Sequence, residues 1–210
     1  RRVVDGVLTG LHRSPHHGAS VEFAEHKEYA PGDEIRHIDW KVFAKSDKYY
    51  VRRFEQETNL RAMILVDASA SMLYQSPAAA QSKWEWASTM AAALAYLLLR
   101  QQDSVGLVVA DDKVVEYVPP RSRSAHLLYL CELLVRNQPK KGARTSLFAG
   151  ASHLSEVLSR RGVVFVLSDF LDTDTRFFQV LKQLKSRRQH VTLMHVLDPW
   201  ELEFPFDGMT

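Results

Sequence analysis

The pattern of apolar positions changes near Asn59. Beyond that residue, short runs rich in Val, Ile and Leu recur at residues 62–66, 105–110, 163–167 and 191–197. Near-continuous runs of this kind are typical of strands that a parallel sheet buries on both faces. We therefore expect the second part of the chain to be built on a sheet with these segments as strands.

Segments with a helical period separate these runs. Residues 83–100 are apolar on most sides, which predicts a well-buried helix. Three further helices are expected at residues 124–136, 146–160 and 175–187. Their apolar stripes are Leu127, Leu130, Cys131 and Leu134; Leu147, Leu154 and Leu158; and Phe177, Phe178, Leu181 and Leu184. Two basic pairs, at residues 160–161 and 187–188, are expected to close the last two helices, because cations suit the negative end of a helix dipole.

One interval breaks the alternation of strands and helices. Only Asp111, Asp112 and Lys113 separate residues 105–110 from the apolar segment 114–118. So short a connection predicts a hairpin, and hence one antiparallel strand at an edge of the sheet. The remaining alternation predicts an open, mostly parallel α/β sheet with helices on both faces. Ligands bind such sheets at the carboxyl ends of the strands.

The first part of the chain has a different pattern, which is short, polar and aromatic. Residues 21–29 and 48–57 are expected to form strands, and Pro31, Gly32 and Asp33 a turn between them. We therefore predict two parts: an amino-terminal β-rich lobe over residues 1–59, packed on a main α/β domain over residues 60–210.

Composition and charge exclude several classes of protein. The chain has 210 residues, 46% hydrophobic and 25% charged, with a net charge of +2, as expected of a folded globule. No apolar stretch reaches the roughly 20 residues that a bilayer span requires, and no signal peptide opens the chain. The single cysteine, Cys131, excludes an internal disulfide and is expected to lie in the core. These features favour a reducing compartment, most simply a cytoplasm.

The candidate chemistry begins where the first strand of the sheet ends. Asp67, Ser69 and Ser71 occupy alternate positions just past the buried run, so that their oxygen atoms can converge on one point. Two more oxygen groups fall at the same edge: Thr145 at the start of a helix, and Asp169 after the run 163–167. Carboxylate and hydroxyl oxygens suit a hard cation such as Mg²⁺, with Mn²⁺ or Ca²⁺ as alternatives. The competing interpretation is that these residues only cap turns and helices.

These residues resemble a known metal site. Asp67, Ser69, Ser71, Thr145 and Asp169 are similar to the five-residue metal-ion-dependent adhesion site of von Willebrand factor A domains, in which the first three residues share one loop. Ala70 departs from that pattern, because many members carry Gly there. The resemblance implies a von Willebrand factor A-like, Rossmann-like sheet, which agrees with the expected edge hairpin.

A second resemblance covers nearly the whole chain. The motifs that carry it are Gly10-Leu11-His12-Arg13-Ser14, Glu22-Phe23-Ala24-Glu25, Tyr29-x-Pro31-Gly32-Asp33, Arg36-x-Ile38-Asp39-Trp40 and Leu197-Asp198-Pro199. They resemble the bacterial family known as domain of unknown function 58, which is itself von Willebrand factor A-like. The resemblance also implies that the protein continues beyond Thr210.

This resemblance implies a function in protein–protein interaction. Members of the family commonly occur beside AAA+ ATPases of the MoxR type and are regarded as their adaptors or co-chaperones. The implied mechanism is non-enzymatic: a metal ion held by the five residues keeps one coordination position open for an Asp or Glu of the partner. The expected partners are a MoxR-type ATPase, an acidic client surface, or both, in a bacterial cytoplasm.

Basic residues gather in the sequence before Thr145. They are Arg121, Arg123, Arg136, Lys140, Lys141 and Arg144, against the single acid Glu132. Arg121, Arg123, Lys140, Lys141 and Arg144 are therefore predicted to steer an acidic partner toward the metal. The alternative is a solvated helix face with no binding role.

Other functions have weaker support in the sequence. A magnesium-dependent hydrolase could use Asp67 as its nucleophile, but such phosphatases need a second Asp two positions on, where Ser69 stands. A metal-independent scaffold remains an alternative. His12, His16 and His17 could bind a transition metal only on a helix, which Pro15 and Gly18 disfavour. The small net charge and the lack of a recognition motif argue against nucleic-acid binding.

Overall fold

A computed structural model of the chain describes residues 21–31, 33, 35, 38–46, 48–56, 60–143, 146–172 and 174–205. The chain divides into two compact units, Arg1–Thr58 and Asn59–Thr210. The larger unit carries the sheet and the candidate chemistry. No helix within the described residues is both long enough and apolar enough to cross a membrane.

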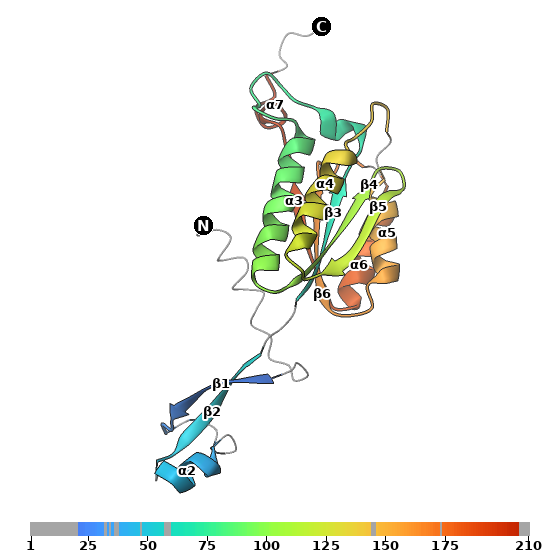
Figure 1. The fold of residues 1–210 in the computed structure, drawn as a ribbon. Helices are drawn as coiled ribbons and strands as arrows, with labels where there is room; N and C mark the ends of the chain where they lie inside the picture. The colour runs from blue at the N-terminus through green and yellow to red at the C-terminus, as the bar shows by residue number, and fades with distance from the viewer. Residues whose placement is uncertain are drawn as a thin grey trace. The chain divides into compact units, whose positions relative to one another are not determined.

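The larger unit is built on a five-stranded sheet (Figure 1). Its strands are β3 (Arg61–Asp67), β4 (Ser104–Ala110), β5 (Val114–Arg121), β6 (Gly162–Ser168) and β7 (Gln189–His195), in the spatial order β5-β4-β3-β6-β7. All neighbours are parallel except β4 and β5, which form the predicted antiparallel hairpin at one edge. Because β3, β4 and β6 run parallel, their carboxyl ends lie side by side along one border of the sheet, its carboxyl edge.

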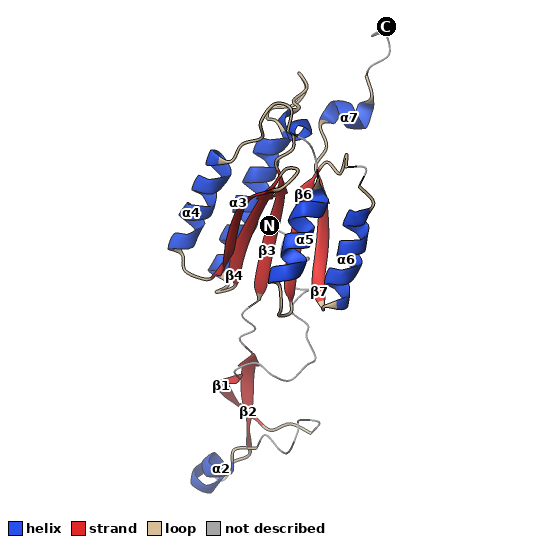
Figure 2. Cartoon of the chain, turned by 90° about the vertical axis from the view of Figure 1, so that its right-hand side faces the viewer, coloured by secondary structure: helices blue, strands red, loops and turns tan. Residues whose placement is uncertain are grey.

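Helices cover both faces of this sheet (Figure 2). On one side lie α3 (Lys83–Arg100) and α4 (Ala125–Arg136), and on the other α5 (Leu147–Val157) and α6 (Arg176–Ser186). A short 3₁₀ helix, η2 (Ala70–Leu73), follows β3, and α7 (Pro199–Glu203) follows β7. The predicted three-layer α/β arrangement is confirmed.

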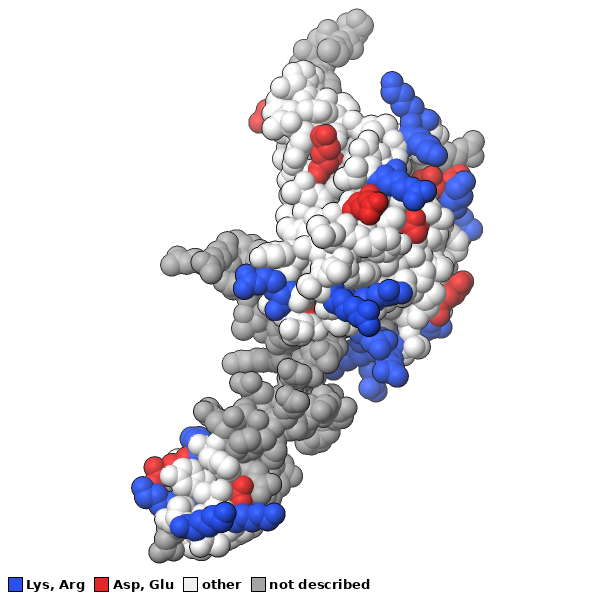
Figure 3. All heavy atoms as spheres, viewed as in Figure 1, with Lys and Arg blue, Asp and Glu red and all other residues white. Residues whose placement is uncertain are grey.

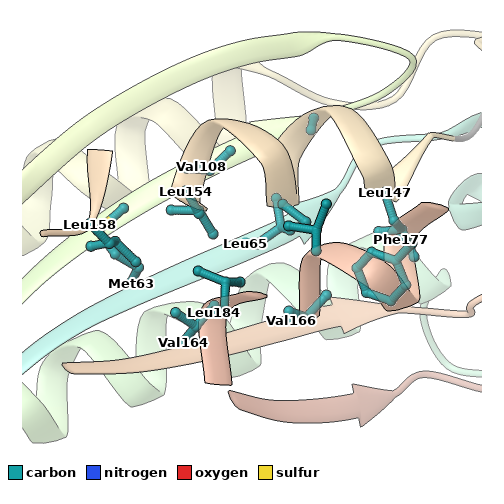
Figure 4. Close-up of a cluster of buried hydrophobic side chains, with 13 residues drawn as sticks. Met63, Leu65, Val108, Leu147, Leu154, Leu158, Val164, Val166, Phe177 and Leu184 are labelled. Carbon is teal, nitrogen blue, oxygen red and sulfur yellow. The ribbon is translucent and has the colours of Figure 1, made fainter. Parts of the chain in front are cut away.

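The core on the α5 and α6 side is a continuous cluster of buried apolar side chains (Figure 4). Met63 and Leu65 of β3 and Val164 and Val166 of β6 point toward α5 and α6, where Leu154 is fully buried. Alternate residues of a strand face opposite sides of a sheet, so the even-numbered positions of β3 are left to pack beneath α3 and α4. Burial on both faces explains why β3, β4 and β6 read as unbroken apolar runs. The run predicted at residues 191–197 was wrongly expected to be buried on both faces, because β7 lies at the edge of this sheet and is only partly buried.

Several helix predictions differ in detail from the structure. The helix α5 ends at Val157, because Leu158 is already extended, so Arg160 and Arg161 lie beyond the helix and do not close it. Phe178, predicted in the buried stripe of α6, is 60% exposed, and Val180 takes the buried position instead. Cys131 is only partly buried, because the buried face of α4 is formed by His126, Leu130, Leu133 and Leu134.

The smaller unit contains a two-stranded antiparallel sheet, β1 (Val21–Glu28) and β2 (Tyr50–Gln56), as predicted. Between the strands lies a helix that the pattern did not predict, α2 (Trp40–Ser46). Asp39 caps its start, because its Oδ1 accepts hydrogen bonds from the backbone N–H groups of Lys41 (3.0 Å) and Val42 (3.3 Å). Gly32, the centre of the predicted turn, lies outside the described residues.

Candidate functional site

Five segments that are distant in sequence meet at the carboxyl edge of the sheet. The backbone N–H of Ala68, just after β3, donates to the carbonyl of Ala110 at the end of β4 (2.7 Å). The N–H of Ala70 donates to Ala143, in the loop after α4 (3.1 Å), and Val196 donates to Ser168 (2.9 Å). The main-chain bonds of Ala68 and Ala70 fix the loop that carries Asp67, Ser69 and Ser71.

Asp67 is the centre of the site. It is 1% exposed, and both carboxylate oxygens accept hydrogen bonds: Oδ1 from the N–H of Ser69 (2.8 Å) and Oδ2 from the hydroxyl of Ser168 (2.5 Å). Burial raises the pKa of this carboxyl group, although the hydrogen bonds from Ser168 and Ser69 act in the opposite direction. The structure therefore holds a carboxylate in one orientation at a cost in solvation, which a bound cation would relieve.

The two serines of the loop lie close to each other. The Oγ atoms of Ser69 and Ser71 are 2.9 Å apart, and Ser69 is fully buried. Ser69 stands at the N-cap of η2 but makes no side-chain capping bond there. The capping interpretation is therefore not supported for Ser69.

Asp169 has a partner that the sequence analysis did not anticipate. Its Oδ2 accepts a hydrogen bond from the ammonium group of Lys83 (2.8 Å), and its Oδ1 accepts one from the N–H of Leu171 (3.2 Å). Lys83 also reaches Oε1 of Glu201 on α7 (2.7 Å). Asp169 therefore lies at the predicted edge, but its charge is already balanced by a buried lysine.

Lys83 and Ser168 are the residues that sequence reasoning missed. Lys83 is the first residue of α3, where Ser82 and Glu85 form a capping box. A cation is unfavourable at the positive end of a helix dipole, so a lysine at that position signals a nearby acid. Ser168 gave no comparable signal, because serine is common where a strand ends and a loop begins.

Thr145 and Arg144, two predicted site residues, lie outside the described residues. The segments on either side are anchored at the same edge. The N–H of Ser146 donates to the carbonyl of Asp111 (3.1 Å), and that of Leu147 to Oδ2 of Asp172 (3.0 Å). Asp172 thus caps the start of α5, a role that the sequence analysis did not assign.

The predicted basic residues do not lie together. Lys140 and Lys141 are exposed in the loop whose Ala143 contacts Ala70, near the site. Arg121 pairs with Val105 at the start of β4, so Arg121 and the adjacent Arg123 lie at the opposite edge of the sheet. On the face shown in Figure 3, the Lys and Arg side chains of this unit likewise form separate groups. Binding of a partner by either group stays a prediction.

The oxygen atoms at this site fit a hard cation such as Mg²⁺ only in part. Asp67, Ser69 and Ser71 supply oxygen atoms only, two of them from hydroxyls in mutual contact, which suits Mg²⁺ better than a softer metal. Asp169 is held by Lys83 and would act at most through water. Within the described ranges, no group of three or more His, Cys, Asp or Glu side chains could hold a metal ion. A cation here would therefore depend on the serine hydroxyls. His12, His16 and His17 lie outside those ranges.

Comparison with known proteins bears on the family and the fold of the chain. Residues 25–210 match the model of a family described as "Protein of unknown function DUF58". Two relatives are the uncharacterized proteins Rv1480 of Mycobacterium tuberculosis (strain ATCC 25618 / H37Rv) and Mb1516 of Mycobacterium bovis (strain ATCC BAA-935 / AF2122/97). Each is 30% identical over 209 residues, covering 99% of this chain and 65% of the relative. The chain thus spans 65% of the length of these relatives.

Solved structures show the same fold. An aerotolerance-related membrane protein of Bacteroides fragilis NCTC 9343 superposes with a TM-score of 0.53 at 21% identity, covering 65% of this chain and 67% of that chain. The conserved hypothetical protein BatB of Bacteroides thetaiotaomicron has a TM-score of 0.51 at 18% identity, covering 65% and 66%. The VWA domain of SpRpn10 matches at a TM-score of 0.45 and 14% identity, covering 66% and 75%. The fold is von Willebrand factor A-like, as predicted.

Proposed function

Because this chain belongs to the DUF58 family, whose function is unknown, we propose a function from its site: divalent-metal-dependent binding of a partner protein. The observation that carries the proposal is the convergence of Asp67, Ser69 and Ser71 at the carboxyl edge of the sheet, with the two hydroxyl oxygens 2.9 Å apart. The von Willebrand factor A-like fold supports an interaction module. The proposed partner is an AAA+ ATPase of the MoxR type, to which this chain would serve as adaptor.

The proposed roles follow from what each side chain contacts. Asp67, Ser69 and Ser71 would hold Mg²⁺ directly, and Thr145 is proposed to complete the set. Asp169 would orient a water molecule from an outer position, because Lys83 keeps its carboxylate in place. When bound, Mg²⁺ would supply an open coordination position for a carboxylate of the partner. Lys140 and Lys141 would attract that acidic surface.

Hydrolysis at Asp67 has less support. Phosphatases that use an Asp nucleophile need a second Asp two positions on as general acid, and Ser69 stands at that position. No observation favours a second candidate function over metal-dependent binding.

The first test is metal binding itself. Mn²⁺ added to the purified chain is followed by electron paramagnetic resonance, with Mg²⁺ as competitor. We expect Asp67→Ala to abolish binding, and Asp112→Ala, an exposed acid of the β4–β5 turn, to leave it unchanged. Circular dichroism in metal-free buffer must show Asp67→Ala folded. Equal Mn²⁺ binding by wild type and Asp67→Ala would refute the site.

The second test concerns the partner. The chain is immobilised and exposed to a lysate of its host in Mg²⁺ or in chelator, and retained proteins are identified by mass spectrometry. A MoxR-type ATPase retained only in Mg²⁺, by wild type and Asp112→Ala but not by Asp67→Ala, supports the adaptor function. Retention that ignores chelator and Asp67→Ala indicates a metal-independent scaffold instead.

A further inference from the structure

The loop that follows β6 is joined directly to the candidate metal site. The hydroxyl of Ser168 donates to Oδ2 of Asp67 (2.5 Å) and accepts a hydrogen bond from the backbone N–H of Phe170 (2.9 Å). The next residue, Leu171, is 60% exposed. A large apolar side chain is therefore open to solvent beside the residues that are proposed to hold the metal.

The backbone around Leu171 is held in one conformation. Its N–H donates to Oδ1 of Asp169 (3.2 Å), and Oδ2 of Asp172 accepts from the N–H of Leu147 at the start of α5 (3.0 Å). Phe170 packs against the core with a φ of 53°, in the left-handed region that bulky residues rarely adopt. Such strain persists only where surrounding contacts impose it, and it is concentrated at binding sites. Leu171 is therefore exposed on a rigid loop.

The loop after β3 also exposes apolar side chains at the carboxyl edge. Leu73 is 37% exposed and Tyr74 is 36% exposed, just after Ser71. The N–H of Tyr74 donates to the carbonyl of Ser71 (3.1 Å), which ties these side chains to the loop of the candidate ligands. Single exposed apolar residues are ordinary on protein surfaces. Here, however, two neighbouring loops that both contribute to the candidate site expose them.

The charge near these loops favours an acidic ligand. Lys140 and Lys141 are exposed in the loop whose Ala143 accepts a hydrogen bond from the N–H of Ala70 (3.1 Å). Neither lysine forms an ion pair with a residue that the structure describes. Their charges would attract an acidic segment to the carboxyl edge. A carboxylate that reached the metal there would bring its neighbours in the segment close to Leu171.

We propose that Leu171, together with Leu73, selects the partner segment by contacting apolar residues on either side of the carboxylate that reaches the metal. This inference rests on the proposed function. The segment it selects has an Asp or Glu between apolar residues. Removal of Leu171 from water would supply affinity that the carboxylate alone lacks. An acidic segment without apolar neighbours would therefore bind more weakly.

The test compares two short synthetic peptides with capped ends. Each has one central Glu, which is flanked by Leu and Val in one peptide and by Ser in the other. Affinity for the chain in Mg²⁺ is measured by NMR titration, which detects weak complexes. We expect the apolar peptide to bind at least about tenfold more tightly than the serine peptide.

Leu171→Ser should remove most of this preference. Because the side chain is exposed, we expect the variant to fold, which circular dichroism checks. It should bind the apolar peptide about tenfold more weakly and the serine peptide as wild type does. The matched control is Leu128→Ser, which changes a leucine that is 76% exposed in the first half of α4, toward the opposite edge of the sheet. It should leave both affinities unchanged.

Mn²⁺ binding separates failure of this inference from failure of the metal site. Leu171→Ser should bind Mn²⁺ as wild type does, because the leucine side chain offers no ligand atom. If Mn²⁺ binds and Asp67→Ala abolishes its binding, equal affinities of the two peptides would overturn only the selection by Leu171. Equal effects of Leu171→Ser and Leu128→Ser would do the same. Absence of Mn²⁺ binding would instead refute the proposed function.

Three further results would overturn the proposal. A preference for the apolar peptide that persists in chelator would break the link between Leu171 and the metal. Concentration-dependent dimerisation that Leu171→Ser abolishes would assign the exposed leucine to a contact with a second copy. Peptide binding that disappears in a longer natural form of the chain would assign it to the chain's own continuation.

Discussion

The ammonium group of Lys83 lies 2.8 Å from Oδ2 of Asp169, and both side chains are almost fully buried. Burial disfavours a charged amine, but hydrogen bonds to Asp169 and Glu201 outweigh it and raise the pKa of Lys83. The pair joins the start of α3 to the end of β6, and Glu201 adds α7. Three charged side chains therefore connect three elements beside the candidate metal site.

Removal of one side chain of the Lys83–Asp169 ion pair should destabilise the fold strongly. Lys83→Met leaves the buried Asp169 carboxylate without its counter-charge, which we expect to lower the free energy of unfolding by about 3–5 kcal/mol. Urea denaturation followed by circular dichroism measures the loss. Lys83→Met combined with Asp169→Asn removes both charges and should recover most of it. A Lys83→Met protein within about 0.5 kcal/mol of wild type, the usual range for surface changes, would show that the pair contributes little.

Ser168 should matter for stability through Asp67. Ser168→Ala removes the hydroxyl that donates to Oδ2 of Asp67 and leaves a buried oxygen without that partner. We expect a loss of about 1–3 kcal/mol in metal-free buffer, measured by urea denaturation. Ser159→Ala, at an exposed position, should change stability by less than about 0.5 kcal/mol. Equal effects of the two substitutions would contradict a role for the Ser168–Asp67 bond.

Features of the structure that are set by residues adjacent in sequence could be predicted from the sequence. The helix α3 begins and ends as predicted, because Ser82 and Glu85 mark its start. Asp67, Ser69 and Ser71 were recognisable because three oxygen groups at alternate positions follow a buried strand. The end of α5 was placed too late, since Leu158 keeps the apolar spacing although its backbone has left the helix.

Contacts between distant segments could not be predicted in the same way. Lys83 and Asp169 are 86 positions apart, and Ser168 and Asp67 are 101 positions apart. No local pattern specifies such pairs, because they depend on how β3, β6 and α3 stack. The same limit explains why Arg121 was grouped with Lys140. The two are close in sequence, but β5 runs antiparallel and carries Arg121 to the opposite edge of the sheet.

Stability should depend on pH through His126. This buried side chain donates from Nε2 to the carbonyl of Val105 (2.9 Å) when that nitrogen carries the proton. Burial, with a smaller contribution from Arg121, lowers the pKa of His126 below its ordinary value of 6.5. The unfolded chain therefore binds a proton at higher pH than the folded chain. The contribution of His126 to the free energy of unfolding is therefore fully present above pH 6.5, and it is lost as the pH falls toward the folded-state pKa.

His126→Gln tests this dependence, because glutamine retains a donor but does not titrate. Urea denaturation is compared above and below the ordinary pKa of histidine, in wild type and variant. We expect the free energy of unfolding to fall more steeply on acidification in wild type than in His126→Gln. Parallel losses in the two proteins would show that the pH dependence comes from other groups.

Gly106 should tolerate no side chain. It lies in β4 where the pairing with β5 shifts between Val105 and Leu107, a β-bulge. A Cβ at this position would stand 2.6 Å from the carbonyl oxygen of Val118 and 2.5 Å from the sulfur of Met63. The thioether of Met63 can move, but the Val118 oxygen belongs to the backbone of β5 and cannot move without displacing that strand.

We therefore expect Gly106→Ala to lower the free energy of unfolding by about 1–3 kcal/mol, the usual cost of overpacking. A double-mutant cycle with Met63→Ala identifies the responsible clash. If the Val118 oxygen limits the space, the coupling free energy should stay below about 0.5 kcal/mol, because removal of the Met63 side chain relieves nothing. A large favourable coupling would assign the strain to Met63 instead. In that case β5 need not shift, and its edge hairpin would tolerate a methyl group at Gly106.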